Sequence, residues 1–389
     1  MRLRRCQTVL IEPRERRELD LELLLSATPR FGSSVEWLAL APHLDKEVPL
    51  DPADFVVLGA VSPTDWVDRD ELVGEHTPAL VDGLRAKGLL VAEGGDAAAD
   101  MADCELRATH WRPLSAVAHR HSRWRSIDTA AEARRLDEIC GDEWLAHFGA
   151  PPPPAIDCAA EDRRVALPRA EVSVLDCLLG RRVTCRNFDP ARGLNLDEVG
   201  AVLWRSFGAR TEVEVTGVRV LKKGVPSAGG LHPTEAYLLV QRVDGLAPGL
   251  YHYHPLHHAL EPLRELSPTE ADEYNQRFVA AQAHFRSAPL LLVMASRFER
   301  NFWKYRNHAK AYRATILDAG HLSQTLYLAA TELGLAAFIT AAINEGDIED
   351  AFGLDPMQQG VIAISGFGHR GPERKEIEFD PLNAVWPAT

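Results

Sequence analysis

The segment Val225–Glu235 reads VPSAGGLHPTE, in which two prolines flank a serine, an alanine, a glycine pair and a histidine. Adjacent glycines lack Cβ atoms and adopt positive φ angles readily, so the backbone here can lie directly against a flat or anionic ligand. Proline and glycine also mark ordinary turns between strands. The segment therefore predicts a ligand-cradling loop only if other parts of the chain supply the remaining contacts of such a site.

The composition predicts a folded protein that does not bind polyanions. The chain has 389 residues, of which 46% are hydrophobic, enough for a buried core and for two or three domains. With 43 basic and 56 acidic residues, the net charge is −13. Such a charge opposes binding to nucleic acid and to an anionic membrane surface.

The cysteines and the N-terminus bear on the compartment. The cysteines show no C-x-x-C pair and no metal-ligand spacing; they are Cys6, Cys104, Cys140, Cys158, Cys177 and Cys185. We expect reduced thiols in a cytoplasm and no disulfides. The start, MRLRRCQTVL, lacks an apolar segment of signal length, and no later run reaches the length of a membrane span, so neither export nor membrane insertion is expected.

Residues 1–48 predict short strands and loops, and the next forty predict three short helices followed by a strand. The helices are indicated by Phe55, Val56 and Leu58, by Ser62-Pro63 ahead of Trp66, and by Thr77-Pro78 with Leu80, Val81 and Leu84; Gly88 precedes the strand Leu89–Val91. This order predicts a winged-helix-like region. Because its helices carry many carboxylates, we expect it to bind peptide or protein rather than DNA.

The middle of the chain contains a basic patch and a proline-rich linker. The patch HRHSRWR, residues 119–125, predicts either a solvated face or a grip on an acidic partner. A helical pattern follows near 130–147, and then PPPPAIDCAAEDRR at 151–164, which is stiff and extended. We therefore predict an N-terminal region at 1–150, a linker at 151–168 and a second domain at 169–389.

The second domain alternates helical and strand patterns in the α+β manner. Asn195 and Glu198 form a capping-box pattern at the start of a helix that ends at Gly208. Strands are predicted at Ala236–Val240, Leu290–Ala295 and Val361–Ile364, and the longest helix at 311–333, where Gly334 stops it.

Arg182, Thr184 and Arg186 alternate along a segment that Phe188 follows. If the segment is extended, both guanidinium groups and the hydroxyl lie on one side, which suits a phosphate. The motif R-x-T-x-R-x-F, the later PSAGG-x-x-P and the run GLYHYHPLHHALEPL together resemble the nitroreductase-like flavoenzymes, and in particular their SagB-type dehydrogenases. The resemblance covers roughly Leu175–Gly368 and implies a central, mostly antiparallel sheet flanked by helices.

The resemblance also implies a cofactor, FMN, and its contacts. Arg182, Thr184 and Arg186 would hold the phosphate, and Arg370 or Arg374 would complete that site; we assign Arg370. The isoalloxazine ring would be lined by Ser227, Ala228, Gly229 and Gly230, with Thr340, Ala341 and Ala342 along its other side. The family's sites are shared between two subunits, which implies a homodimer.

Lys304-Tyr305, in FWKYRNHAKAYRATILDAGHL, resembles the Lys-Tyr pair of the azoline oxidases in this family. Aromatising an azoline requires removal of a Cα proton while hydride leaves Cβ, and a lysine or tyrosinate can be tuned to take that proton. Phe302 and Trp303 would supply the apolar surround that lowers the pKa of the lysine. An exposed Lys-Tyr pair at a helix start is the alternative.

The histidines around His252 and His254 suggest a metal site by their spacing, but no cysteine or carboxylate beside them in the sequence completes one, so no metal is assigned. We therefore expect a cytoplasmic FMN-dependent dehydrogenase that converts azolines of a modified precursor peptide to azoles, with dioxygen reoxidising the flavin and a separate cyclodehydratase or other maturation enzyme as partner. The alternatives are an NAD(P)H-dependent reductase of dehydroamino acids or small electrophiles, and a silent FMN-binding scaffold.

Overall fold

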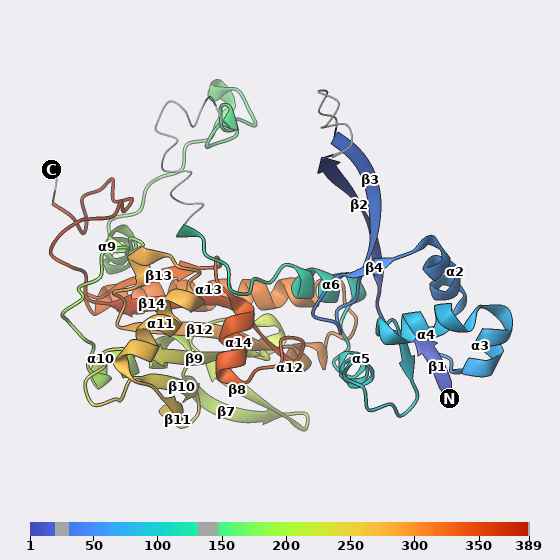
Figure 1. The fold of residues 1–389 in the computed structure, drawn as a ribbon. Helices are drawn as coiled ribbons and strands as arrows, with labels where there is room; N and C mark the ends of the chain where they lie inside the picture. The colour runs from blue at the N-terminus through green and yellow to red at the C-terminus, as the bar shows by residue number, and fades with distance from the viewer. Residues whose placement is uncertain (20–30, 131–145, 147, 388–389) are drawn as a thin grey trace.

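In the computed structural model, which describes residues 1–19, 31–130, 146 and 148–387, the C-terminal domain is built on a six-stranded sheet (Figure 1). The strand order is β11-β10-β9-β12-β14-β13, and each neighbouring pair is antiparallel. The strands are β9 (Thr234–Val240), β10 (Gly249–His254), β11 (Ala259–Glu265), β12 (Leu290–Arg297), β13 (Ala336–Thr340) and β14 (Gln359–Gly368). The predicted α+β fold and its three predicted strands are confirmed.

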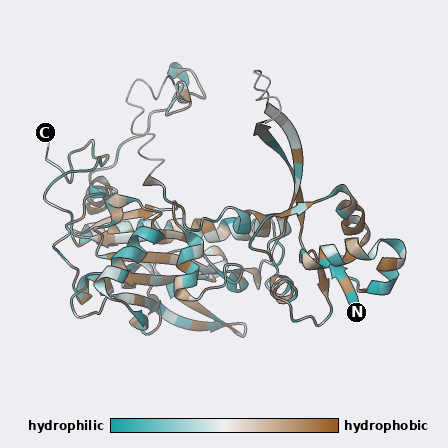
Figure 2. Ribbon diagram, viewed as in Figure 1, coloured by the Kyte–Doolittle hydropathy of each residue, from teal (hydrophilic) through white to brown (hydrophobic). Residues whose placement is uncertain are grey.

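Helices cover both faces of this sheet (Figure 1). Leu238 and Leu292 face one side, where they share a core with α10 (Leu196–Ser206) and α13 (Ala311–Glu332). The residues that alternate with these along the strands, such as Leu239, face the other side and pack toward α11 (Pro268–Phe278) and α14 (Glu345–Phe352). Because both faces are covered, β12 is buried almost throughout as LLLVMAS. Figure 2 shows largely hydrophilic residues on the outer surfaces of α11 and α14.

The two helices behind the sheet begin and end where the sequence predicts. The Asn195 side chain accepts a hydrogen bond from the Glu198 amide, and the Glu198 carboxylate accepts one from the Asn195 amide, so α10 has the predicted capping box. The long helix α13 is stopped by Gly334 at φ 72°. One face of α13 is buried in the core of the domain, and the other face, which carries Ile316 and Leu317, is exposed.

The N-terminal region has a small sheet of its own, of order β5-β1-β6. Its elements are β1 (Arg2–Arg5), α2 (Pro52–Ala60), β5 (Val67–Asp68), α3 (Arg69–Glu75), α4 (Pro78–Ala86) and β6 (Leu90–Ala92). The predicted strand at Leu89–Val91 pairs with β1 instead of with a following wing strand. The predicted helix after Ser62 is wrong, because the Ser62 hydroxyl accepts the Thr64 and Asp65 amides in a turn. The winged-helix assignment stays a prediction.

A long hairpin stands away from this region (Figure 1). It pairs β2 (Leu10–Leu19) with β3 (Phe31–Leu40), and β3 also pairs with β4 (Val48–Leu50). The sequence indicates only short strands here, because β2 reads LIEPRERREL and its charges fall on both faces. Within the described part of the ribbon, only its base, at Leu38–Leu40, is buried, and the rest has no buried face, so the alternation that marks a strand is absent there.

The basic patch 119–125 docks the N-terminal region onto the C-terminal domain. It follows α5 (Ala98–Ala108) and spans the end of α6 (Pro113–His121). Arg123 pairs with Glu349 and Arg125 with Asp350, both on the acidic helix α14. The Trp124 amide donates to the Glu345 carboxylate at 2.9 Å. The patch therefore serves a contact within the chain rather than a solvated face.

The linker is exposed, and the cysteines that the structure describes form no disulfides. Residues 151–172 are exposed, with one short 3-10 turn at Glu161–Arg163 before α9 (Val174–Arg181). The helix predicted near 130–147 lies almost wholly outside the described residues, and so does Cys140. The other five cysteines are free. Among the helices that the structure describes, none has the length and apolarity needed to cross a bilayer.

Candidate functional site

The glycine loop joins the hairpin β7 (Ala209–Val215) and β8 (Val218–Lys223) to β9. Ala228–Gly230 forms a short 3-10 turn in which Gly229 has φ 63° and Gly230 has φ 69°. These left-handed conformations favour glycine, as the sequence predicts. His232 also has a positive φ, 47°, and burial together with the nearby Lys223 lowers its pKa to about 4. The two glycines adopt this conformation readily, whereas His232 holds a φ that is uncommon for a residue with a side chain.

Support for the loop comes from Asp318 on α13. The Ser227 hydroxyl donates to one carboxylate oxygen of Asp318 at 2.5 Å, and the Ala228 amide donates to the other at 3.1 Å. Burial raises the pKa of Asp318, while these donors favour its charged form. Sequence analysis missed Asp318, because α13 also carries other polar and charged residues and nothing local marks this one. His321, which lies in the same D-A-G-H run, is exposed.

The Lys304-Tyr305 pair lies against the glycine loop. It follows the short helix α12 (Phe298–Phe302), within the turn that leads into α13. A Cβ atom at Gly229 would lie 2.6 Å from the Tyr305 hydroxyl and 2.9 Å from the Lys304 ammonium. The two candidates named from distant parts of the sequence therefore meet. However, Lys304 is exposed and Trp303 is 48% exposed, so the predicted apolar enclosure of the lysine is wrong for the single chain.

The register of the sheet explains why these segments meet. Thr234, at the start of β9, lies opposite Ser296 near the end of β12. Since β13 is antiparallel to β14, and β14 to β12, β13 also ends toward this edge, at Thr340. The Thr340 hydroxyl accepts from the Ala342 amide and bonds to Gln282. Thr340, Ala341 and Ala342 thus follow the correct end of a strand, but no contact joins them to the glycine loop among the described residues.

The first motif splits into two environments. The Arg182 guanidinium lies over the Tyr327 ring, 5.4 Å from its centroid, and the Thr184 hydroxyl is 3.0 Å from the Tyr327 hydroxyl. Arg182 has no carboxylate partner among the described residues. Arg186 instead donates through its side chain to the Ile377 carbonyl at 2.8 Å. The assignment of all three residues to one phosphate stays a prediction.

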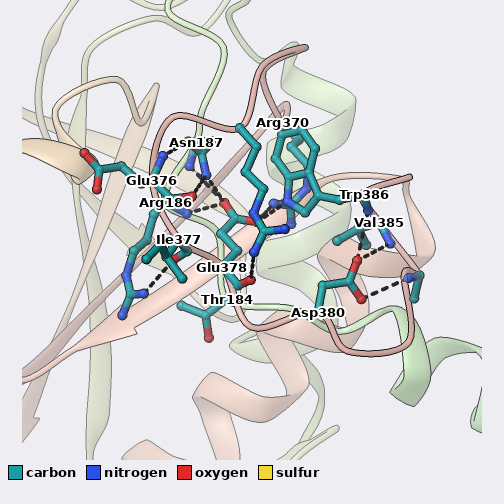
Figure 3. Close-up of polar contacts among 12 residues, drawn as sticks. Thr184, Arg186, Asn187, Arg370, Glu376, Ile377, Glu378, Asp380, Val385 and Trp386 are labelled. Carbon is teal, nitrogen blue, oxygen red and sulfur yellow. Dashed lines mark hydrogen bonds and ion pairs between the residues drawn. The ribbon is translucent and has the colours of Figure 1, made fainter. Parts of the chain in front are cut away.

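A buried carboxylate, Glu378, gathers the end of this motif and the C-terminal segment (Figure 3). It accepts hydrogen bonds from the Arg186 amide at 2.6 Å and from the Asn187 amide at 3.0 Å. The Trp386 indole donates to it at 2.8 Å, and Arg370 forms an ion pair with it. Sequence analysis missed Glu378, which no local pattern marks. Arg370 is therefore committed to a carboxylate, and a phosphate would have to compete with that pair.

The helix α13 separates the two halves of the candidate site. Asp318 holds the glycine loop, and Tyr327 contacts Arg182 and Thr184. Nine residues correspond to about two and a half helical turns and to about 13 Å along the axis. The two contacts therefore lie on opposite sides of the helix. One chain presents the glycine loop and the arginine motif as two half-sites.

In the hairpin of β10 and β11, which carries the histidines, carboxylates lie close to His252. His252 is 2.7 Å from the Glu261 carboxylate and 3.6 Å from that of Glu235, and these partners raise its pKa, Glu235 most. The view that no carboxylate lies nearby is therefore wrong. The rings of His254 and His257 lie 4.3 Å apart. Even so, within the described part of the chain no three His, Cys, Asp or Glu side chains are grouped to hold a metal ion.

Known proteins resemble this chain in its C-terminal domain. The model of the Nitroreductase family matches residues 179–369. "Putative nitroreductase MJ1384" of Methanocaldococcus jannaschii is 30% identical over 191 residues, which cover 48% of this chain and 87% of that protein. Trifolitoxin-processing protein TfxB of Rhizobium leguminosarum bv. trifolii is 31% identical over 144 residues, which cover 37% of this chain and 38% of TfxB.

A third relative is microcin B17-processing protein McbC of Escherichia coli, 27% identical over 161 residues, which cover 38% of this chain and 54% of McbC. A chain of the E. coli microcin synthetase McbBCD complex with truncated pro-MccB17 bound aligns with a TM-score of 0.48 at 20% identity, over 69% of this chain and 97% of that one. The chain spans little more than a third of TfxB and about half of McbC, but most of MJ1384. Together, the family model and the match over most of MJ1384 show that this chain belongs to the nitroreductase family.

Proposed function

We propose that this chain is a SagB-type, FMN-dependent dehydrogenase that oxidises azolines of a modified precursor peptide to azoles. The observation that carries the proposal is the contact of Lys304 and Tyr305 with Gly229. It brings a pair of proton-transfer groups to the loop that would line a flavin. The kinship with two proteins named for peptide-toxin processing supports the choice of substrate class.

The residues present fit FMN. Gly230 would meet nothing within 4 Å of an added Cβ, so a flat ring has room to approach the backbone there. Arg182 has no carboxylate partner among the described residues. Both its guanidinium and the Thr184 hydroxyl contact Tyr327. A guanidinium and a hydroxyl so placed suit a phosphate. Arg370 would join them only after leaving Glu378.

In the proposed reaction, the Lys-Tyr pair removes a proton from the substrate. Bound FMN would supply the two-electron acceptor for the hydride from Cβ, with dioxygen as the final oxidant. Lys304 or Tyr305 takes the proton from Cα, so that one C–H bond at each carbon breaks and a double bond forms between them. Since Lys304 is exposed in the single chain, the proposal requires that substrate or a second subunit cover it during the reaction.

A homodimer would join the two half-sites. The glycine loop and the arginine motif lie on opposite sides of α13, so one flavin that touches both draws them from different chains. Exposed apolar side chains near the arginine motif support such an interface: Leu175, Leu179, Ile377 and Phe379 are exposed by 43 to 85%. An isologous dimer would cover both copies at once.

The division of labour follows the predicted boundaries. We assign residues 1–150 to peptide binding, 151–168 to a linker and 169–389 to the oxidoreductase domain. Docking of the patch 119–125 on α14 fixes the first part against the third. The heterocycle itself would come from a separate cyclodehydratase or other maturation enzyme, since no part of this chain is assigned to that reaction.

The test is the spectrum and turnover of the purified protein. We expect a flavin absorbance band, and oxidation of an azoline peptide with uptake of dioxygen. Lys304→Ala and Tyr305→Phe should keep the flavin band and lower the oxidation rate by about 10²-fold or more, the scale of a general base. Variants that oxidise at near-normal rates would show that the pair is structural.

One observation favours a second function. The exposure of Lys304, together with the kinship to MJ1384, is compatible with a reductase that uses NAD(P)H on dehydroamino acids or small electrophiles. NAD(P)H turnover that needs neither Lys304 nor Tyr305 would select this function. Bound flavin without activity toward either class would leave an FMN-binding scaffold.

A further inference from the structure

The turn that carries Lys304 and Tyr305 depends on the N-terminal region. Residues 303–310 lie between α12 and α13 and are exposed except for Tyr305. The Tyr305 amide donates to the Asn301 carbonyl of α12 at 3.2 Å. Asn307, at φ 52°, donates through its amide to the His110 carbonyl at 3.0 Å. A residue from the other end of the chain therefore fixes the middle of the turn.

Trp111, next to His110, clamps both ends of the same turn. It is 1% exposed, and its indole N–H donates to the Met357 carbonyl at 2.8 Å. Its ring lies 4.5 Å from that of Phe298 and 4.7 Å from that of Phe302, both on α12. It also lies 5.6 Å from the Tyr312 ring, in the first turn of α13. One side chain thus packs against the helix before the turn and the helix after it.

His119 of α6 reinforces the same two flanks. Its ring lies 4.9 Å from Phe298 and 5.3 Å from Tyr312. His119 Nε2 lies 2.8 Å from the Pro356 carbonyl and 3.2 Å from the Arg123 guanidinium, and Nδ1 lies 3.0 Å from the Tyr312 hydroxyl. The ring is buried, and burial holds its pKa well below the ordinary value. The N-terminal region therefore also meets α12 and α13 through a buried, hydrogen-bonded histidine ring.

We propose that Trp111 is a positioning residue for the Lys304-Tyr305 pair, so that the N-terminal region forms part of the oxidoreductase site. The inference rests on the proposed function, in which that pair transfers the proton. Tyr305 of the pair packs against the hydrophobic cluster that contains Trp111. Trp111 holds the two helices between which the pair is carried, and a displacement of about 1 Å in a reacting group lowers rates by up to 10²-fold.

The experiment compares two tryptophan variants of the full-length, flavin-loaded protein. Trp111→Leu removes the clamp. Trp37→Leu removes a tryptophan that packs edge-on against Phe55 at 5.2 Å. Trp37 belongs to the N-terminal core, a hydrophobic cluster separate from the one that joins Trp111 to α12 and α13. We expect Trp111→Leu to lower kcat for an azoline peptide by about tenfold or more, and to shift the pH profile of kcat, while flavin occupancy and KM stay unchanged. Trp37→Leu should leave flavin occupancy and the pH profile of kcat unchanged.

Hydrogen exchange tests the positioning without any substrate. Amides of residues 303–310 should exchange faster in Trp111→Leu and at the normal rate in Trp37→Leu. If Trp111→Leu does not fold, Trp111→Phe keeps a ring and loses only the bond to Met357, and a smaller effect of the same kind is expected. Unchanged exchange with an unchanged pH profile would overturn the proposal. Failure of the unaltered protein to oxidise azolines would overturn the proposed function, and exchange would still decide the role of Trp111.

Discussion

Two adjacent glycines with the same backbone conformation differ in what surrounds them. Gly229 and Gly230 have φ 63° and 69°, so alanine at either position would cost about 1–2 kcal/mol of backbone strain. A Cβ at Gly229 would also meet Tyr305 and Lys304, whereas one at Gly230 would meet nothing within 4 Å. The pair of positions thus separates backbone strain from contact with the proton-transfer groups.

We therefore expect Gly229→Ala and Gly230→Ala to lower the free energy of unfolding by similar amounts, and only Gly229→Ala to lower turnover strongly. Denaturant titration measures the first quantity and steady-state kinetics the second. Equal losses of turnover would mean that the contact with Lys304 and Tyr305 does not matter, because Gly230→Ala shares the strain but lacks the contact.

Single residues also mark the limit of what the sequence predicts. The glycine pair and Lys304-Tyr305 stand in recognisable local patterns. Asp318 and Glu378 do not, because each acts on residues far away in the chain: Asp318 on Ser227, 91 positions earlier, and Glu378 on Arg186, 192 positions earlier. A carboxylate that bonds to backbone amides leaves no spacing to detect, so these anchors needed the fold.

At the scale of elements, capping residues and hydrophobic periodicity predicted correctly the helices and strands that have a buried face. Asn195 and Gly334 mark the ends of α10 and α13 in the sequence as in the fold. The length of the hairpin of β2 and β3 escaped prediction because most of the described part of β2 is exposed and only the base of the hairpin packs on a core. The docking of the basic patch also escaped, since its partner α14 begins more than two hundred residues later.

Two of the three arginines of that patch, Arg123 and Arg125, should differ sharply in their contribution to stability. The side chains of Arg123 and Glu349 are 8% and 3% exposed, while those of Arg125 and Asp350 are 59% and 66% exposed. Arg123→Met would leave a buried carboxylate unpaired, at a cost of about 3–5 kcal/mol. Arg125→Met should cost about 0–1 kcal/mol. Urea denaturation followed by circular dichroism measures both, and equal costs would show that the buried pair does not hold the interface.

At the scale of the whole molecule, buried histidines set the response to acid. Burial lowers the pKa of His43, His119 and His121, and lowers those of His232 and His284 to about 4. A histidine whose folded-state pKa lies below its unfolded value of about 6.5 contributes stability that is present above pH 6.5. That stability is lost as the pH falls through the folded pKa. His252, whose pKa is raised, acts in the opposite direction.

We therefore expect the free energy of unfolding to fall as the pH drops from about 6.5 toward 4, before most carboxylates are protonated. Denaturation midpoints at a series of pH values, at constant ionic strength, test this. A flat profile across that window would mean that the histidines remain solvated. His119→Gln should reduce the slope, since that position then no longer titrates.

The carboxylate of Glu378 also imposes an order of assembly. It ties the Arg186 and Asn187 amides to a segment that follows the last strand, β14, and the loop so closed spans 191 residues at the least. Contacts between residues this distant form late, because the entropy of closing the loop must be overcome first. A chain interrupted between Gly368 and Glu378 would contain every strand of the six-stranded sheet, but the Arg186 and Asn187 amides would lack their bonds to Glu378. The anchor beside the arginine motif therefore needs the last segment of the chain, and we expect it to form after the sheet.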